Sequence, residues 1–400
     1  MARELNAASI PKGWTYGLLD DYAERCSGHT PSKSYPEYWN GGIKWISLAD
    51  TFRLDNGLVK ETDKEISDLG IQNSSAQLHP AGTVVLSRDA GIGKSGVMAE
   101  PMAVSQHFIA WKCDANKKLH NWYLYNWLQL HKSEFERQAV GSTIKTIGLP
   151  YFKKLKIAAP SYEEQRKIAK ILLTWDKAIT TTEKLIETSK QQKKSLMQQL
   201  LTGQKRLVNP ETGKAFEGEW KKVELGKLLD YKQPTPYLVK STEYSDDYPT
   251  PVLTAGKTFI LGYSNEDFGI FREELPAIIF DDFTTASKFV DFPFKAKSSA
   301  MKILIAKDGI SIKYVYEAMQ VLNYPVGGHQ RHWISIFANL VIGLPKPEEQ
   351  QKIASVLTAA DKEIEVLEAK LAHFKQEKKA LMQQLLTGKR RVKVEEMEVA

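Results

Sequence analysis

Apolar residues recur at alternating spacings of three and four along two stretches of the chain, residues 168–200 and 353–385. Only Lys378 interrupts the later stretch, whereas the earlier one carries Thr182, Ser189 and Lys193 in its seam. This heptad-like spacing predicts two long helices that pair as a coiled coil, because a partner helix is needed to bury each apolar stripe. The residues predicted to form the pair are Ile168, Leu172, Trp175, Ile179, Ile186, Leu196, Leu200, Ile353, Leu357, Ile364, Leu367, Leu371, Phe374, Leu381 and Leu385.

A long internal repeat connects the two stretches. Residues 196–203 and 381–388 are identical, and the residues near 163–206 align with those 185 positions later at roughly 24 identities in about 44 positions. Such a repeat predicts two copies of one plan, each a globular module followed by a helix, with a pseudo-two-fold relation between the copies.

Residues at the ends of both helices support this assignment. Ser161 and Glu164 have the spacing of a capping box, and Pro347 stands where the second helix should begin. Gly203 and Gly388 follow the last seam leucines and predict C-terminal stops. About 39 helical residues would span roughly 58 Å. We expect two antiparallel helices with a module at each end of the rod; in the alternative, each helix folds back on its own module.

The regions outside the helices predict an α+β fold. Short β-type runs separated by turn residues occur in the first module, as in 43–47, 83–87 and 106–111, and in the second, as in 277–280 and 301–305. Helices are expected at 121–138 and near 311–322. The modules share the residues before each long helix at the offset of 185, but little between. Two different recognition tasks would explain this divergence, as would drift after duplication.

Composition narrows the function only slightly. The net charge is +7, and about +5 of it falls in residues 159–207; this excess supports nucleic-acid binding only weakly. The two cysteines, Cys26 and Cys113, argue against a disulfide framework and fit a reducing cytosol. No signal peptide or membrane-spanning apolar run is apparent, so we expect a cytoplasmic protein with no membrane partner.

No catalytic motif in the sequence is convincing. Residues 88–95 imitate a phosphate-binding loop but have Arg88 where the first glycine belongs, so a glycine-rich turn is the better interpretation. His329 and His332 lack acidic or thiol partners at zinc-ligand spacing. Hydrolase, protease, kinase and dinucleotide-binding motifs are missing. We therefore predict no catalytic residues and no metal site, and expect a binding protein.

The whole pattern resembles the specificity subunit of bacterial type I restriction–modification systems. The resemblance lies in the duplicated helix ending Met-Gln-Gln-Leu-Leu-Thr-Gly, and in the helix entry at 345–350. Residues 28–32 followed by 43–47 resemble the opening of one target-recognition domain, and 249–256 with 279–285 resemble another variety. The resemblance implies a first target-recognition domain (1–158), a central helix (159–207), a second target-recognition domain (208–344), a C-terminal helix (345–392) and a tail (393–400).

The resemblance also implies a division of labour. Each domain reads one half of a split, asymmetric double-stranded DNA sequence, and the helices set the gap between the halves. The helices bind two DNA adenine methyltransferase subunits, and restriction or translocase subunits join the full complex. S-adenosylmethionine, ATP and Mg²⁺ are then expected on these partners, and no cofactor on this chain.

Base reading requires polar side chains held on loops that reach a groove. Lys205 and Arg206 are separately hypothesised to contact phosphate whatever the DNA sequence. The residues predicted to bind DNA are His29, Thr30, Ser32, Lys33, Arg88, Lys94, Ser142, Thr143 and Lys145 in the first module, and Lys257, Thr284, Thr285, Ser287, Lys288, His329, Gln330, Arg331 and His332 in the second.

Two other functions compete with this hypothesis. One is a two-module adaptor that assembles through its coiled coil and binds peptides or sugars. The other is an enzyme with an unrecognised site, such as a nuclease. DNA binding with a methyltransferase subunit, or metal-dependent cleavage by the isolated chain, would separate the three.

Overall fold

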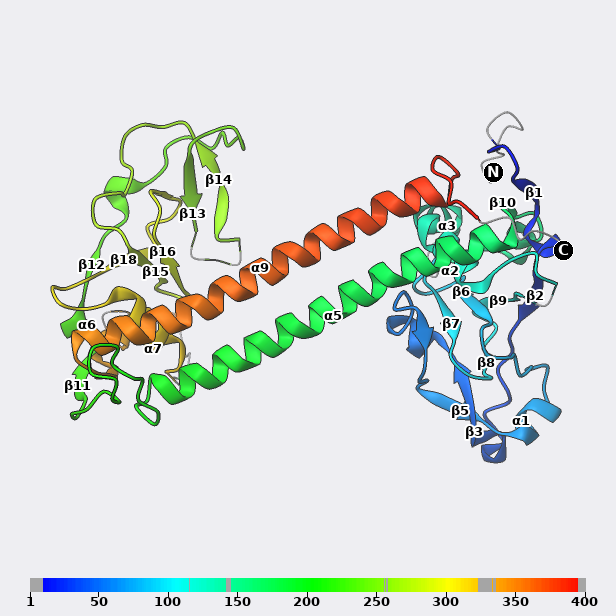
Figure 1. Ribbon diagram of the computed structural model, residues 1–400, viewed down its shortest axis with the longest axis horizontal. Coiled ribbons are helices and arrows are strands. Elements are labelled where there is room, and N and C mark those ends of the chain that lie inside the picture. Colours follow the sequence, from blue (N-terminus) through cyan, green and yellow to red (C-terminus); the bar gives the residue numbers. More distant parts are fainter. Residues whose placement is uncertain are drawn as a thin grey trace. The chain divides into compact units, whose positions relative to one another are not determined.

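The computed structural model describes residues 10–114, 116–141, 145–254, 256, 258–322, 333 and 336–394. The chain divides into two compact units, residues 1–182 with 370–400 and residues 183–369. Each unit therefore holds one module together with part of both long helices (Figure 1).

The two predicted long helices are present. Helix α5 spans Tyr162–Leu200 and helix α9 spans Pro347–Leu385, each 39 residues long. Pro347 is the first residue of α9, as predicted. The backbone at Gly203 and Gly388 has φ of +76° and +70°, the left-handed conformation that ends helices.

In the first unit, the start of α5 lies beside the end of α9. The rings of Trp175 and Phe374 meet edge to face with centroids 5.7 Å apart. Lys378 Nζ donates to Asp176 Oδ1 at 2.5 Å. The lysine that interrupts the apolar seam is thus neutralised by an aspartate of the facing helix.

In the second unit, the end of α5 lies beside the start of α9. Lys190 pairs with Glu368 at 2.6 Å, and Lys193 pairs with Asp361 at 2.6 Å. Because α9 numbers fall as α5 numbers rise, the helices are antiparallel here. The Lys193–Asp361 pair corresponds, at the offset of 185, to Lys378–Asp176, so both repeats solve the polar interruption in the same way.

The seam positions are fully or partly buried. The residues Ile168, Leu172, Ile186, Leu200, Ile353, Leu357, Ile364 and Leu385 are buried, and Trp175, Ile179, Leu196, Leu367, Leu371, Phe374 and Leu381 are partly buried. Thr182 and Ser189 are also buried; their hydroxyls donate to Ala178 O and Glu363 Oε1. Hydrogen bonds within α5 and across to α9 therefore make polar seam residues compatible with burial.

The first module is built of β-sheets, with α2 and α3 at the end beside α5 and α1 at the opposite end, near β3 and β5 (Figure 1). A five-stranded sheet has the order β2-β9-β6-β7-β4, and a three-stranded sheet has the order β5-β3-β8. Its strands are β1 (Thr15–Leu18), β2 (Glu24–Ser27), β3 (Trp39–Ile46), β4 (Leu58–Val59), β5 (Lys64–Ile66), β6 (Val84–Ser87), β7 (Ser95–Met98), β8 (Ala103–Val104), β9 (Phe108–Lys112) and β10 (Lys156–Ala159). Its helices are α1 (Asp68–Gln72), α2 (Asn121–Leu130), α3 (Lys132–Gln138) and α4 (Leu149–Lys153), with 3-10 turns η2 (Leu19–Asp21), η3 (Pro36–Tyr38) and η4 (Leu48–Phe52).

The second module follows the same plan with different contents. A four-stranded sheet has the order β12-β18-β15-β16, and a three-stranded sheet has the order β14-β13-β17. Its strands are β11 (Lys221–Glu224), β12 (Leu229–Lys232), β13 (Thr250–Leu253), β14 (Ile260–Ser264), β15 (Ala277–Asp281), β16 (Ser287–Val290), β17 (Lys295–Ala296), β18 (Met301–Ala306) and β19 (Val341–Leu344). Its helices are α6 (Leu225–Leu228) and α7 (Ile312–Gln320), with 3-10 turns η5 (Thr235–Tyr237) and η6 (Phe337–Asn339).

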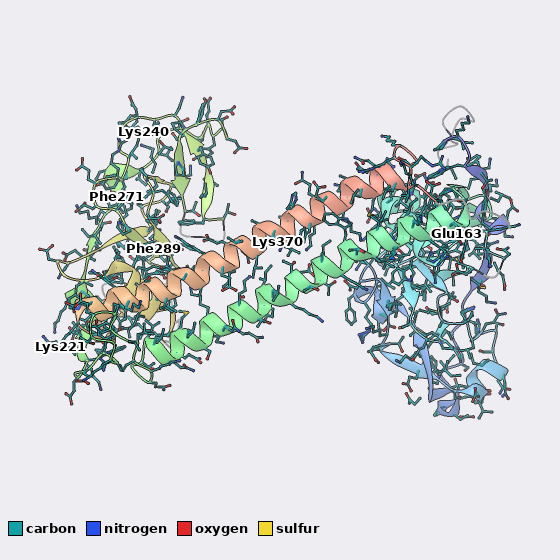
Figure 2. All side chains as sticks on the ribbon, in the orientation of Figure 1. Glu163, Lys221, Lys240, Phe271, Phe289 and Lys370 are labelled. Atoms are coloured by element: carbon teal, nitrogen blue, oxygen red, sulfur yellow. The ribbon has the colours of Figure 1, made fainter. Side chains whose placement is uncertain are left out.

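Among the described residues, the first module has three apolar cores and the second has two. In the second module Phe271 belongs to a core shared by the three-stranded and four-stranded sheets, and Phe289 borders the core that faces the long helices (Figure 2). That second core takes in Leu200 of α5 and Ile353 of α9. In the first module the corresponding core takes in Ile168 of α5. Each module is therefore anchored on the long helices of its own unit.

Two local predictions are corrected. The helix expected over 121–138 is broken at His131, whose Nδ1 bonds to Trp127 O at 2.8 Å and whose backbone leaves the helical region. The capping box is only half formed, because Ser161 Oγ accepts from Glu164 N while the Glu164 carboxylate binds Arg391 instead. A long-range ion pair overrides the local motif.

Candidate nucleic-acid interface

Two of the predicted loops of the first module contact residues 106–107, and a third segment joins them through Asp89. Gln106 Oε1 accepts a hydrogen bond from Thr30 Oγ1, and the neighbouring His107 Nδ1 lies 2.5 Å from Asp89 Oδ2. Asp89 also accepts from Thr146 Oγ1. The structure thus joins loops 29–33, 88–94 and 145–147 into one surface, which we call the first cluster.

The His29–Lys33 loop is positioned through its backbone. His29 N donates to Val104 O at 3.0 Å, and Trp45 Nε1 donates to His29 O at 3.1 Å. A Cβ on Gly28 would lie 2.0 Å from Val104 O, so only glycine permits this close approach. The side chains of His29, Ser32 and Lys33 are exposed.

The 88–94 segment is a tight hairpin turn between β6 and β7, in agreement with the glycine-rich turn predicted in place of a phosphate loop. Gly91 and Gly93 have φ of +71° and +78°, and Ser87 N donates to Lys94 O. Lys94 Nζ donates to Thr51 O at 3.2 Å and its side chain is partly buried. This hydrogen bond ties the turn to η4. The predicted contact of Lys94 with DNA stays a prediction.

Arg88 and Lys145 stand at the edge of the first cluster. Arg88 is partly buried, with its Nε 3.7 Å from Asp89 Oδ1, and its carbonyl accepts from Ile147 N at 2.9 Å. Lys145 is exposed. Ser142 and Thr143 lie outside the described residues, so their role stays a prediction.

An exposed aromatic residue near this surface was missed from the sequence. Phe52, at the end of η4, is 64% exposed, and the Arg53 guanidinium lies 4.5 Å from its ring centroid. The adjoining Thr51 holds Lys94 of the hairpin turn. Exposure of a single phenylalanine gives no pattern in the sequence, because only the fold decides which face of a 3-10 turn is covered.

The second module presents a short turn between β15 and β16. Asp281 Oδ1 accepts from Phe283 N at 2.8 Å and from Thr284 N at 3.2 Å. Thr285 has φ of +63°, and Phe283 is 50% exposed at the tip. The side-chain hydrogen bonds of Asp281 thus set the turn that displays the predicted threonines.

Ser287 and Lys288 follow this turn on β16. Ser287 Oγ accepts from Gln320 Nε2 at 2.9 Å, which ties it to the end of α7. Lys288 is exposed. Lys257 and the whole His329–His332 motif lie outside the described residues, and their predicted DNA contacts stay predictions.

Asp282 links this turn to two other parts of the second module. It is buried, its Oδ2 lies 3.7 Å from Lys302 Nζ on β18, and its Oδ1 accepts from Trp333 N at 2.9 Å. We call residues 281–288, Lys302 and Trp333 the second cluster. The sequence offered only an adjacent pair of aspartates, which is common at turns.

The structure places Arg206, which was hypothesised to contact phosphate, in an ion pair of the second unit. Its Nε and Nη2 donate to the buried Glu349 carboxylate at 2.6 and 2.7 Å, and its Nη1 donates to Gly218 O at 2.9 Å. The hydrogen bonds to Glu349 raise the pKa of Arg206 above its ordinary value. Lys205 is exposed and remains a candidate phosphate contact.

The first unit repeats this arrangement. Arg391 donates from Nε and Nη2 to Glu164 at 2.8 and 2.6 Å, and from Nη1 to Lys12 O. Glu164 and Glu349, like Arg206 and Arg391, are 185 residues apart. The end of one helix is thus fixed to the start of the other by the same bidentate ion pair in both units.

Equivalent two-stranded sheets lie beside these ion pairs. In the first unit β1 pairs with β10, with Thr15 opposite Ala159. In the second unit β11 pairs with β19, with Lys221 opposite Leu344. The shared residues before each long helix, noted in the sequence, therefore pair in both units with the first strand of the module, and Ala159 and Leu344 occupy equivalent positions.

A metal site or a membrane-spanning helix would bear on the function of the protein. Within the described ranges, no group of three or more His, Cys, Asp or Glu side chains is arranged to hold a metal ion. Among the same residues, no helix is long and apolar enough to cross a membrane.

Comparison with known proteins gives one consistent family. The family model for the type I restriction modification DNA specificity domain matches the chain twice, at residues 11–191 and 217–376. Each match covers one module and part of the long helix that follows it.

Relatives with the same description differ in how much of the chain they match. The EcoR124I/EcoR124II specificity subunit of Escherichia coli is 50% identical over 145 residues, which is 35% of this chain and 35% of that protein. The MjaVIII specificity subunit of Methanocaldococcus jannaschii is 26% identical over 98% of this chain and 96% of its own length. The type I S subunit structure from M. genitalium superposes with a TM-score of 0.64 at 16% identity, over 96% of this chain and 97% of that one, which shows a shared fold.

Proposed function

This chain belongs to the type I restriction modification DNA specificity family, and we propose that its two modules read the two halves of one bipartite DNA sequence. The observation that supports the proposal most directly is the contrast within the repeat. The structure that joins each module to the long helices is the same in both units, including the Glu–Arg ion pairs. The two clusters differ in their loops and exposed side chains.

We further propose that α5 and α9 fix the gap between the half-sites. Each helix of 39 residues is about 58 Å long, which corresponds to roughly 17 base-pair steps of 3.4 Å. The coiled coil then transmits a change in helix length to the spacing of the recognised halves.

Catalysis is assigned to partner subunits in this proposal. DNA adenine methyltransferase subunits dock on the helices and carry S-adenosylmethionine, and restriction subunits use ATP and Mg²⁺. Methylation of a base requires it to be flipped from the duplex into a pocket of the methyltransferase. This chain contributes sequence choice, and the adaptor hypothesis is not favoured by its family membership.

The test is to express the chain with a methyltransferase subunit of its own system and map methylated adenines across a genome. We expect a motif of two short sequences separated by a fixed unspecified gap. Exchanging residues 208–344 for those of a relative should change one half only. A continuous motif, or a motif unaffected by the exchange, would contradict the proposal.

A further inference from the structure

We propose that Asp89 and Asp282 are positioning residues for base reading. Each joins the hairpin turn of its module to the segment before the module's exit, by which we mean the shared residues that lead into the long helix. The turn and this segment then move together, and we call this connection the lock. This inference rests on the proposed function. It concerns residues that make no DNA contact themselves, and it follows from the polar contacts inside each cluster.

In the first module, the lock has three parts. Asp89 is only 9% exposed and lies just after β6. Its carboxylate meets His107, the residue before β9, and the hydroxyl of Thr146 before the exit. A backbone hydrogen bond from Ile147 N to Arg88 O, at 2.9 Å, runs beside the side-chain contact.

In the second module, different residues occupy the same three places. Asp282 is 2% exposed and lies just after β15. Its carboxylate meets the ammonium of Lys302, near the start of β18, and Trp333 N before the exit. β15 and β18 pair antiparallel, as β6 and β9 do.

Burial makes these contacts costly to lose. A carboxylate removed from water must find donors, and charge-assisted hydrogen bonds are shorter and stronger than neutral ones. The two segments joined in this way are far apart in sequence, so their relative position depends on such tertiary contacts, to which the backbone bond from Ile147 N to Arg88 O also contributes in the first module. The exposed polar residues are next to the locked ones: Lys145 adjoins Thr146, and Thr284 is two residues beyond Asp282.

Recognition of base edges requires such rigidity. Bidentate hydrogen bonds to a base demand that donors be held within a few tenths of an ångström, which flexible loops do not provide. Loss of the lock should therefore reduce discrimination between bases more than it reduces attraction to phosphate. It should do so only for the half-site read by that module.

The experiment uses the full chain purified with its methyltransferase subunit and a pool of duplexes randomised over about 30 base pairs, or three turns. The wild-type complex first defines both halves of the motif. Binding is then measured to the selected duplex and to duplexes with one half scrambled. For Asp89→Asn we expect the cognate-to-scrambled ratio of the first half to fall about tenfold, and that of the second half to stay within about twofold.

Asp282→Asn should give the converse result, so each variant serves as the other's control. Asp63→Asn and Asp308→Asn alter exposed carboxylates and should change neither ratio. Should Asp89→Asn fold poorly, Thr146→Val removes only the hydroxyl, whereas Thr146→Ser retains it. We expect Thr146→Val to reproduce the loss and Thr146→Ser to restore the wild-type ratio.

Failure of this inference is distinct from failure of the proposed function. If the wild-type complex selects no bipartite motif, the proposed function is wrong. If it selects one and the locked variants keep both ratios, or weaken binding to all duplexes equally, Asp89 and Asp282 are not positioning residues for base reading.

Discussion

Replacing Arg206 with alanine tests whether the repeated Glu–Arg pairs fasten the helix ends. The Glu349 side chain is 2% exposed and that of Arg206 is 24% exposed. After Arg206→Ala, the remaining hydrogen-bond donor to the Glu349 carboxylate, among the residues that the structure describes, is Trp220 Nε1 at 3.2 Å. The substitution therefore leaves a buried negative charge with one weak partner.

Breaking a buried pair by removing one member costs about 3–5 kcal/mol of unfolding free energy. We expect about 3 kcal/mol here, the lower end of that range, because partial exposure of Arg206 lets water approach the carboxylate. With a urea dependence of about 2 kcal/mol per molar, the unfolding midpoint should fall by roughly 1.5 M. Urea unfolding of the full chain, followed by tryptophan fluorescence, measures this shift.

Two variants make the measurement specific. Lys205→Ala removes a neighbouring exposed charge and should shift the midpoint little. The double variant Arg206→Met with Glu349→Leu replaces the pair by apolar groups and should recover most of the lost stability. The reasoning is refuted if Arg206→Ala and Lys205→Ala unfold alike and both reduce the salt dependence of DNA binding, because Arg206 would then contact phosphate.

Three further predictions concern spacing, pH and half-site choice. A four-residue insertion at matching points of both helices adds about one turn, or 5.4 Å, and should lengthen the gap between the half-sites by about one to two base pairs. Selection from a library of duplexes with different spacers measures this gap. An unchanged gap would mean that the helices do not set the distance. Burial, and to a smaller extent the nearby Lys112, lower the pKa of His79 below 6.5. Below that pH the unfolded chain therefore binds more protons than the folded chain. The stability of the fold should fall as the pH drops below about 6.5. His79→Gln should reduce this slope in urea titrations from about pH 7.5 to 5, whereas His373→Gln, on an exposed site, should leave it unchanged. Lys288→Ala should weaken binding in the second half-site and Lys145→Ala in the first, by about 1 kcal/mol each in binding titrations; equal effects on every duplex would instead indicate phosphate contact.

The duplicated plan and its long helices could be predicted from the amino-acid sequence alone. Heptad spacing and the residues at helix ends are local signals, so the helix start at Pro347 and the stop at Gly388 follow from neighbouring residues without any knowledge of distant contacts. The shared residues before each long helix could also be predicted, because the equivalent strands β10 and β19 keep their apolar residues. The β-type runs identified β3, β6, β9, β15 and β18, because a short and nearly continuous apolar run marks a buried strand in the sequence.

Which polar side chains remain free for a partner depends instead on the folded arrangement of the chain. Arg206 and Glu349 are 143 residues apart, and Asp89 and Thr146 are 57 apart. Neither separation leaves a local pattern. A charged residue on a loop looks the same in sequence whether its partner is water, DNA or a buried carboxylate, because the burial that selects among these partners arises from contacts between distant segments.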